Sequence, residues 1–401
     1  MSTVDFASLV DAVIERHGED LWELSRFLYA NPELALAEFK AHDKLCAFLK
    51  SHGFEVRRNH LLETAFRAEF DAPGGTDGPT VAIMAEYDAL PEIGHACGHN
   101  LIAESAVGAA IAVMEAMKTT DTIRGKLVVM GTPAEENCGG KEILLQKGAF
   151  SDIDVAMMVH PCTSDTIRPG ASARQKTTVC FRGKAAHAAG CPWEGLNAVD
   201  AAVASYNNIS LLRQQMKPTS RIHGIFVEAG TSCNVIPESS KLIYNIRGET
   251  ARDLDELVAK VEDCFQAAAL ATGCTVTMEN DILYKDFVHN TVLSKIYRKH
   301  GRRMGVRFED DDMVKVHGTG ASSDAGNVSH ELPTLHPVFL IPASSGNHTR
   351  AFAEAANSPD AQPPTLRAAK LLALTALDVL ADPALLADVQ REFREWKSSC
   401  A

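Results

Sequence analysis

Four short runs of apolar residues each lead into side chains that can bind a metal ion or move a proton. The runs cover residues 81–84, 127–130, 155–159 and 338–341. Each is too short and too uniformly apolar for a surface helix, so we expect buried strands of a largely parallel sheet. Ligands collect beyond the carboxyl ends of the strands in open α/β sheets. The side chains that follow these runs should therefore meet in one pocket.

The side chains after the four runs form a mixed set of metal donors and carboxylates. They are Cys97 and His99, then Glu135 and Glu136, then His160, and finally His348. Gly98 permits a tight turn that aims its two neighbours at one point. Each segment alone has an ordinary explanation: an incidental Cys-x-His, a solvated glutamate pair, a histidine capping a strand or lying in a surface loop. Their shared position at strand ends favours a metal site.

The two glutamates are expected to have different roles. Hydrolysis at a metal needs an anionic ligand and a general base, and adjacent residues of an extended segment point apart. We assign Glu136 to the metal and Glu135 to the base. The five mixed ligands Cys97, His99, Glu136, His160 and His348 exceed what a closed structural zinc needs and predict two divalent ions with a shared ligand. Thiolate and imidazole favour zinc, whereas carboxylates and open positions permit manganese.

The 401 residues predict two or three domains. Strands and helices alternate up to about residue 172 and again after Asp281, which is α/β order. Residues 173–280 instead follow the order β-α-β-β-α-β, the split βαβ pattern of a ferredoxin-like domain. We therefore expect an α/β catalytic domain formed by 1–172 and 281–401, with a mostly parallel sheet flanked by helices. An α+β domain at 173–280 is inserted into it.

Helical periodicity appears at both ends of the chain and after the Cys97 loop. It predicts two helices in the first 55 residues, separated by a turn at 31–33. It also predicts one helix over 101–117 and two C-terminal helices over 363–381 and 384–396.

Charge and composition exclude several partners. The net charge of −13 and the absence of a basic cluster argue against nucleic acid. The N-terminus lacks a signal-peptide pattern, and no apolar stretch approaches the ~18 residues of a membrane span. The ten cysteines are scattered without a disulfide framework. We expect reduced thiols in a cytoplasmic protein.

Five segments resemble metallopeptidase family 20, which includes aminoacylases, carboxypeptidase G and aminobenzoyl-glutamate hydrolase. They are AEYDALP at 85–91, HACGHN at 95–100, GTPAEE at 131–136, VHP at 159–161 and GNH at 346–348. The resemblance extends over nearly the whole chain. Residues 192–198, 206–208 and 213–218 are similar to a dipeptidase subgroup of that family.

This resemblance implies a di-metal catalytic domain and a lid domain that pairs two subunits into a homodimer. It gives the same five ligands and the same base, Glu135. It also implies that His187 reaches the neighbouring subunit's active site and polarises the scissile carbonyl. Asn234 and Arg247 match lid positions that hold substrate, Arg247 by pairing with a carboxylate.

The implied substrates are small dipeptides in which a β-alanyl or γ-aminobutyryl group precedes lysine or ornithine. An alternative is an N-acyl amino acid or aminobenzoyl-glutamate amidohydrolase with the same metals and a different pocket. A second alternative, from another class, is a non-catalytic metal-binding assembly protein.

The chain departs from the family pattern at two positions. Distant relatives have a histidine ligand two residues before the strand-end aspartate, whereas Glu86 precedes Asp88 here. Many Cys/His relatives have aspartate where Asn100 stands, which favours the dipeptidase subgroup. Cys138, beside the glutamate pair, is expected to be a small loop residue.

Overall fold

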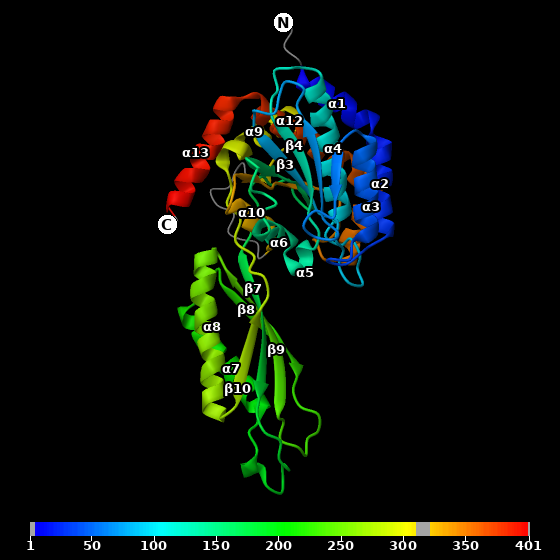
Figure 1. The fold of residues 1–401 in the computed structure, drawn as a ribbon. Coiled ribbons are helices and arrows are strands. Elements are labelled where there is room, and N and C mark those ends of the chain that lie inside the picture. Colours follow the sequence, from blue (N-terminus) through cyan, green and yellow to red (C-terminus); the bar gives the residue numbers. More distant parts are fainter. Residues whose placement is uncertain (1–4, 310–320, 400–401) are drawn as a thin grey trace. The chain divides into compact units, whose positions relative to one another are not determined.

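The computed structural model describes residues 5–309 and 321–399. These residues form two compact units, which are considered separately (Figure 1). The first unit contains 5–169, 287–309 and 327–399, and the second contains 170–286 and 321–326.

A six-stranded sheet is the core of the first unit, with the strand order β1-β2-β4-β3-β5-β11. The strands are β1 (Glu55–Arg58), β2 (Phe66–Asp71), β3 (Thr80–Ala85), β4 (Lys126–Gly131), β5 (Val155–Met157) and β11 (Thr334–Leu335). β3 pairs in parallel with both β4 and β5, and β11 pairs in parallel with β5. β1 and β2 join the other side in antiparallel pairings. The sheet is therefore mixed, with its parallel part at β4, β3, β5 and β11.

The fourth apolar run lies outside this sheet, contrary to expectation. Its strand, β12 (Val338–Leu340), pairs in parallel with β6 (His160–Cys162) in a separate two-stranded sheet. Pro337 interrupts the path from β11 to β12, because proline has no N–H to donate to a ladder. The register places Val338 beside His160, so the fourth run still leads toward the same region as the third.

Helices surround the sheet of the first unit. They are α1 (Phe6–Arg16), α2 (Gly18–Ala30), α3 (Phe39–Ser51), α4 (His99–Lys118), α5 (Glu135–Cys138), α6 (Gly140–Gln146), α9 (Thr291–Arg303), α11 (Arg350–Ala356), η4 (Pro359–Ala361), α12 (Gln362–Ala381) and α13 (Pro383–Ser399). α10 (Ala325–Ser329) crosses the sequence boundary between the units. The expected first helix is two helices, because His17 leaves helical geometry (φ −96°, ψ 4°) immediately before the flexible Gly18.

Helix α4 lies in the centre of the first unit. It packs against β3 and β4 on one side and against α1, α2 and α12 on the other. In the described part of the chain it alone has the length and apolar composition to cross a membrane, with a mean hydropathy of 1.3. Because 94% of that window is buried inside the protein, α4 has the character of a core helix.

The second unit is an antiparallel sheet in the order β10-β7-β9-β8, with two long helices packed on it (Figure 1). Its elements are β7 (Ala173–Arg182), η1 (Pro192–Glu194), α7 (Ala198–Leu211), η2 (Leu212–Gln215), β8 (Arg221–Glu228), β9 (Ser239–Gly248), α8 (Ala251–Thr272) and β10 (Thr275–Asn280). Their order is the predicted β-α-β-β-α-β order. Alternate residues of β9, including Leu242, Tyr244 and Ile246, enter the core beneath the helices. The intervening residues face away from that core.

Candidate metal centre and active site

The loop before α4 presents two predicted donors to one place. Gly98 has a left-handed backbone (φ 80°), and a Cβ there would lie 2.5 Å from Cγ of Pro161. Only glycine meets both demands. The turn holds Cys97 and His99 on either side of it, and both side chains are buried.

Asp88 fixes the orientation of two neighbours. Its Oδ1 lies 3.0 Å from Nδ1 of His99, and its Oδ2 accepts the backbone N–H of Glu136 at 3.0 Å. Nδ1 of His99 therefore donates, and Nε2 is the atom directed at the cluster. Burial opposes a charge on His99, but Asp88, Cys97 and Glu86 raise its pKa well above the usual value. The pocket thus favours a cation at Nε2.

His160 is held as a neutral donor. Its Nδ1 donates to the carbonyl of Pro161 at 2.8 Å, and its Nε2 lies 3.5 Å from Sγ of Cys97. Burial lowers the pKa of His160, despite the opposing charge of Glu86. A neutral imidazole with its proton on Nδ1 has its lone pair on Nε2, the atom that faces Cys97.

His348 joins the cluster from the loop after β12. Its backbone N–H donates to the carbonyl of Ala96 at 2.8 Å, and Nδ2 of Asn347 donates to the carbonyls of Cys97 and Pro161. Nε2 of His348 lies 3.4 Å from Oε2 of Glu136. Burial acts to raise the pKa of Glu136, but the hydrogen bond from His348 and the charges of His99 and His348 lower it overall. Glu136 is therefore an anion in this pocket.

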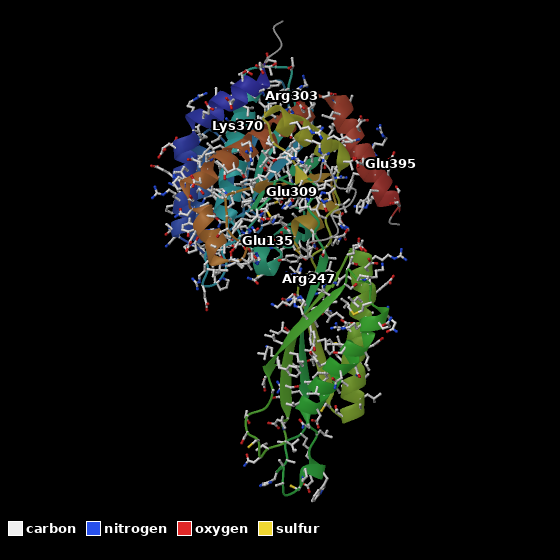
Figure 2. All side chains as sticks on the ribbon, turned by 180° about the vertical axis from the view of Figure 1, so that it is seen from behind. Glu135, Arg247, Arg303, Glu309, Lys370 and Glu395 are labelled. Carbon is white, nitrogen blue, oxygen red and sulfur yellow. The ribbon has the colours of Figure 1, made fainter. Side chains whose placement is uncertain are left out.

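Glu135 is a buried residue on the short helix α5, labelled in Figure 2. The expectation of an extended segment is wrong here, because both glutamates lie in one helical turn. Consecutive residues of a helix still point about 100° apart, so the two carboxylates diverge. Ala134, with φ 62°, begins the turn and donates its N–H to Oε1 of Glu38 at 2.9 Å.

The donor atoms have the spacing and the missing partners of a metal site. Bond lengths of about 2.0–2.3 Å in tetrahedral geometry put neighbouring ligand atoms about 3.3–3.6 Å apart. The contacts between Cys97 and His160 and between Glu136 and His348, at 3.5 and 3.4 Å, match this spacing. Nε2 of His99 and Oε1 of Glu136 are buried without a hydrogen-bond partner. Both atoms need a cation.

Four groups of three donor residues lie close enough to hold an ion, and two of these groups share Cys97. Cys97 lies with His99 and His160 in one group and with Glu136 and His348 in the other, with ligand atoms within 4.8 Å of one another. Burial and the charge of Glu136 raise the pKa of the Cys97 thiol well above its usual value, so its deprotonation requires a cation. The residues present fit a pair of divalent ions.

Three charged residues of this pocket have roles that the sequence alone does not indicate. Glu86 and Asp88 are the first and third residues after the strand β3, and Lys141 lies in α6. Nζ of Lys141 donates to Oε1 of Glu86 at 2.6 Å, and both side chains are buried. Burial opposes ionisation of Glu86, but the charges of Lys141 and His99 lower its pKa. The sequence contains one signal for these roles, which is the pair of carboxylates at the end of the first apolar run.

Two of the three predicted lid residues, His187 and Asn234, lie side by side in the second unit. The N–H of Ala188 donates to the carbonyl of Asn234 at 3.0 Å, beside the bridge between His187 and Val235. Nδ1 of His187 accepts the N–H groups of Ala189 and Gly190 at 3.2 and 3.0 Å. The proton of the neutral ring is therefore on Nε2, which can donate to an oxygen.

Arg247 is far from this pair. It lies opposite Arg174 at the beginning of β7, whereas His187 comes after Arg182 at the other end of that strand. The eight steps along the strand from Arg174 to Arg182 span about 26 Å at about 3.3 Å per residue. The second unit therefore carries its predicted functional residues at opposite ends of one sheet.

Comparison with known proteins gives the family. Residues 174–272 match the peptidase dimerisation domain. The chain is 46% identical over 392 residues to the Xaa-Arg dipeptidase of Mus musculus, covering 95% of this chain and 90% of the relative. It is 26% identical over 460 residues to a subunit of the p-aminobenzoyl-glutamate hydrolase of Escherichia coli, covering 96% and 94%.

A solved structure shares the fold. It is a Bacillus subtilis protein described as a dinuclear metal-binding peptidase of the M20 family, with a TM-score of 0.69 and 19% identity. The match covers 91% of this chain and 99% of that structure. The extent of the 46% identity to the mouse dipeptidase decides the assignment, and the chain belongs to the M20 family of metallopeptidases.

Proposed function

We propose that this enzyme is a metal-dependent dipeptidase that releases a C-terminal basic residue. The observation that carries the proposal is the pocket in which two groups of metal donors share Cys97 and adjoin the buried Glu135. The similarity to the mouse Xaa-Arg dipeptidase supports a basic C-terminal residue. We therefore expect substrates in which a β-alanyl or γ-aminobutyryl group precedes lysine, ornithine or arginine.

The cofactor in this proposal is a pair of zinc or manganese ions. Cys97 with His99 and His160 would hold one ion, and Cys97 with Glu136 and His348 the other. Bound divalent ions supply Lewis-acid polarisation of a carbonyl oxygen and acidify water. Asp88 contributes by keeping Nδ1 of His99 engaged, which leaves Nε2 for coordination.

Glu135 is the general base and acid of the proposed reaction. Its carboxylate takes a proton from the attacking water and gives it to the nitrogen of the leaving amino acid. The turn that carries Glu135 is tight: a Cβ at Gly140 would lie 1.8 Å from the carbonyl oxygen of Pro133. Together with the bond from Ala134 to Glu38, this turn limits the movement of the base.

His187 is the proposed electrophilic partner of the scissile carbonyl. Its Nδ1 accepts two backbone N–H groups, so Nε2–H is available to donate to the carbonyl oxygen. Negative charge develops on that oxygen in the transition state, and a fixed donor there stabilises it.

The separation of His187 and Arg247 supports an active site shared between two subunits. A dipeptide backbone spans about 7 Å, which is far shorter than the distance of about 26 Å along β7. One chain cannot therefore place both side chains on the same substrate. A homodimer resolves this problem if His187 and Asn234 come from one subunit and Arg247 from the other. The match of residues 174–272 to a dimerisation domain supports that arrangement.

The alternative is hydrolysis of aminobenzoyl-glutamate or of an N-acyl amino acid by the same metal site. It is favoured by the similarity to the Escherichia coli hydrolase over 96% of this chain. A non-catalytic metal-binding protein would have no use for Glu135 beside its ligands, which makes that alternative the weakest.

The deciding experiment compares three substrates with one enzyme. Protein reconstituted with zinc or with manganese is assayed on β-alanyl-lysine, N-acetyl-methionine and aminobenzoyl-glutamate, beside a chelator-stripped control. Metal-dependent cleavage confined to β-alanyl-lysine is the expected result. Preference for either of the other two would move the assignment to the alternative, and bound metal without any hydrolysis would refute an enzymatic role.

A further inference from the structure

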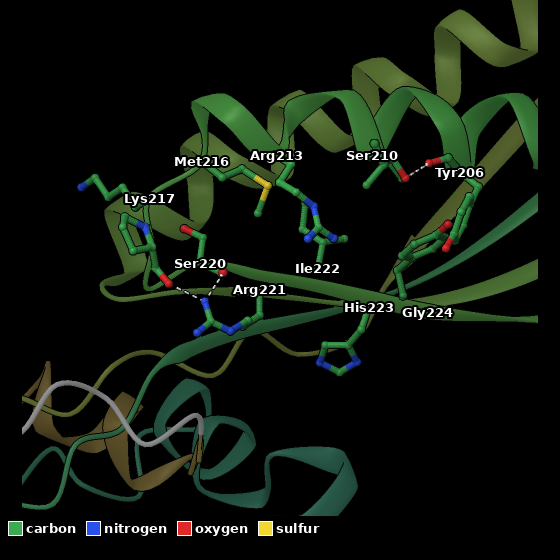
Figure 3. A pocket seen from close by; sticks show the side chains of 13 residues that line it. Tyr206, Ser210, Arg213, Met216, Lys217, Ser220, Arg221, Ile222, His223 and Gly224 are labelled. Atoms are coloured by element: carbon green, nitrogen blue, oxygen red, sulfur yellow. Dashed lines mark hydrogen bonds between the residues drawn. The ribbon is translucent and has the colours of Figure 1, made fainter.

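Three polar side chains are enclosed in the first unit, where helices α2 and α4 pack together. Ser25 of α2 and Asn100 and Glu104 of α4 have no exposed surface. The hollow of about 520 Å³ in the second unit differs in this respect, because side chains of its wall, such as Tyr206 and Arg213, reach solvent (Figure 3). The polar atoms of the enclosed cluster must instead be satisfied inside the protein.

Asn100 joins three segments of the first unit. Its Nδ2 donates to Oγ of Ser25 and to the carbonyl of Ala356, both at 3.0 Å. Ala356 is the last residue of α11, a helix that begins two residues after His348. Asn100 itself directly follows His99 in α4. One amide group thus connects the helix that begins with His99 to the helix that follows His348.

The loop before α4 contacts the segment of His348 at a second point. The N–H of His348 donates to the carbonyl of Ala96 at 2.8 Å. His99 lies between Ala96 and Asn100 in the chain. Its position relative to His348 is therefore set from both sides, by the backbone bond at Ala96 and by the side chain of Asn100.

The remaining polar atoms of the cluster are acceptors that lack donors. The Asn100 amide uses both of its N–H groups, and its Oδ1 is buried without a hydrogen-bond partner. Neither carboxyl oxygen of Glu104 has a partner at full hydrogen-bond geometry. Burial raises the pKa of Glu104 to about 8, and the nearby Ser25 hydroxyl opposes this only in part.

The spacing of Asn100 and Glu104 brings these acceptors together. The two residues are four positions apart in α4, so their side chains are neighbours on one face of the helix. An ionised Glu104 would place negative oxygens beside Oδ1 of Asn100, and the two groups would repel each other. A protonated Glu104 can instead donate its O–H to that oxygen.

We propose that Glu104 is an uncharged carboxylic acid that completes a hydrogen-bonded ring with Asn100 and Ser25. The ring positions the ligands His99 and His348 for metal binding. In it Glu104 donates to Oδ1 of Asn100, the amide donates to Ser25, and the Ser25 hydroxyl donates to the other oxygen of Glu104. The cluster then contains no buried charge and no unpaired acceptor. Glu104 acts through Asn100 and is thus a positioning residue. The inference rests on the proposed metal centre and not on the identity of the dipeptide.

The first measurement is the zinc affinity of the protein in competition with a chromogenic chelator, which needs no turnover. Glu104→Leu and Ser25→Ala should each weaken affinity roughly tenfold, the lower end of the loss that follows removal of an outer partner of a ligand. Glu104→Gln should keep the wild-type affinity, because its amide can donate to Asn100 and accept from Ser25. Ser105→Ala is the matched control, because Ser105 is equally buried in α4 but bonds to the carbonyl of Ile102, outside the ring.

Each other result of this measurement overturns part of the proposal. Unchanged affinity in Glu104→Leu and Ser25→Ala would refute the positioning role, and so would an equal loss in Ser105→Ala. A loss in Glu104→Gln as large as that in Glu104→Leu would show that the carboxylate charge is needed, which would refute the uncharged acid. Absence of ions from the wild type would refute the metal centre itself. Thermal unfolding verifies that each variant is folded, and Ser25→Ala decides alone if Glu104→Leu is not.

Infrared spectroscopy of the metal-free protein tests the ring without any metal. At about pH 7, below the pKa of Glu104 at about 8, the wild type should show a C=O stretching band of a protonated carboxyl group that Glu104→Gln lacks. Other protonated carboxyl groups, such as that of Glu38, are common to both proteins and cancel in the difference spectrum. The losses of unfolding free energy in Ser25→Ala and Glu104→Leu should also be non-additive in the double variant, because either change opens the same ring. A missing band or additive losses would refute the ring.

Discussion

His99 is bound through Nδ1 to Oδ1 of Asp88 at 3.0 Å, and the other oxygen of that carboxylate accepts the backbone N–H of Glu136. One buried aspartate therefore sets the ring of one metal donor and the backbone of another. Asp88 follows β3, and Glu136 follows β4, which is the parallel neighbour of β3. Asp88 can therefore reach both His99 and Glu136.

Replacing Asp88 should weaken metal binding more than it weakens the fold. Asp88→Asn keeps an oxygen for His99 but removes the charge and places an amide group near the N–H of Glu136. Loss of such an outer partner typically costs 10–100-fold in metal affinity, and we expect about that loss in competition with a chromogenic chelator. Asp121→Asn, at an exposed loop position, is the control. Wild-type affinity in Asp88→Asn would contradict the orienting role.

The two adjacent glutamates should separate catalysis from metal binding. Glu135→Gln should lower kcat roughly 10²–10⁴-fold while two metal ions remain bound, because only general-base catalysis is removed. Glu136→Gln should instead lower the bound-metal stoichiometry, because it removes a ligand charge shared with His99 and His348. The measurements are the metal content of each dialysed protein and its turnover, which together show which glutamate binds metal and which acts as the base. The reverse pattern would exchange the two assignments.

Glu38 should make the metal-free protein less stable as the pH rises. Burial raises its pKa from 4.5 to about 7, although the bond from Thr64 opposes this. Between pH 4.5 and 7, Glu38 therefore keeps its proton in the folded state and has lost it in the unfolded chain. The free energy of unfolding should fall across pH 4.5–7 by roughly 3 kcal/mol from this group and stay level above pH 7.

Glu38→Gln removes this titration and keeps an acceptor for the N–H of Ala134. The measurement is urea unfolding of the chelator-treated wild type and variant at several pH values. Because other titrating groups are common to both proteins, the difference between them isolates Glu38. A difference that does not change with pH would refute the assignment.

Much of the fold follows from local patterns in the sequence. Uniform apolar runs are sufficient to identify β3 and β4, because a strand buried on both faces has no polar positions. The two C-terminal helices and the order of the second unit follow from periodicity in the same way. The break at His17 does not, because the apolar spacing continues through it and only the backbone geometry of one residue changes.

Pairing between distant strands was the harder part to predict. The placement of β12 beside β6 depends on Pro337 and on hydrogen bonds between segments nearly 180 residues apart in the sequence. The site shows the same limit. Cysteine and histidine are rare enough to be noticed at strand ends, whereas the roles of Asp88 and Lys141 depend on contacts across the sheet.

Mixing two inactive variants should restore activity if the active site is shared between subunits. In a dimer of His187→Ala with Glu135→Gln, one site would combine an intact Glu135 with an intact His187 from the partner, and the other site would have neither. Random pairing of equal amounts makes half of the dimers mixed, so about a quarter of wild-type activity is expected.

Co-expression with two different affinity tags isolates the mixed dimer and removes the uncertainty of subunit exchange. That dimer should have about half of the wild-type activity, since one of its two sites is intact. A mixture of His187→Ala with Arg247→Ala offers a second test, because the span of about 26 Å along β7 assigns these residues to different subunits of one site. If both residues served a site within their own chain, neither mixed dimer would exceed the activity of its parents. That outcome would refute the shared site. The strand length of β7 argues against it, because a substrate as short as a dipeptide cannot reach both residues of one chain.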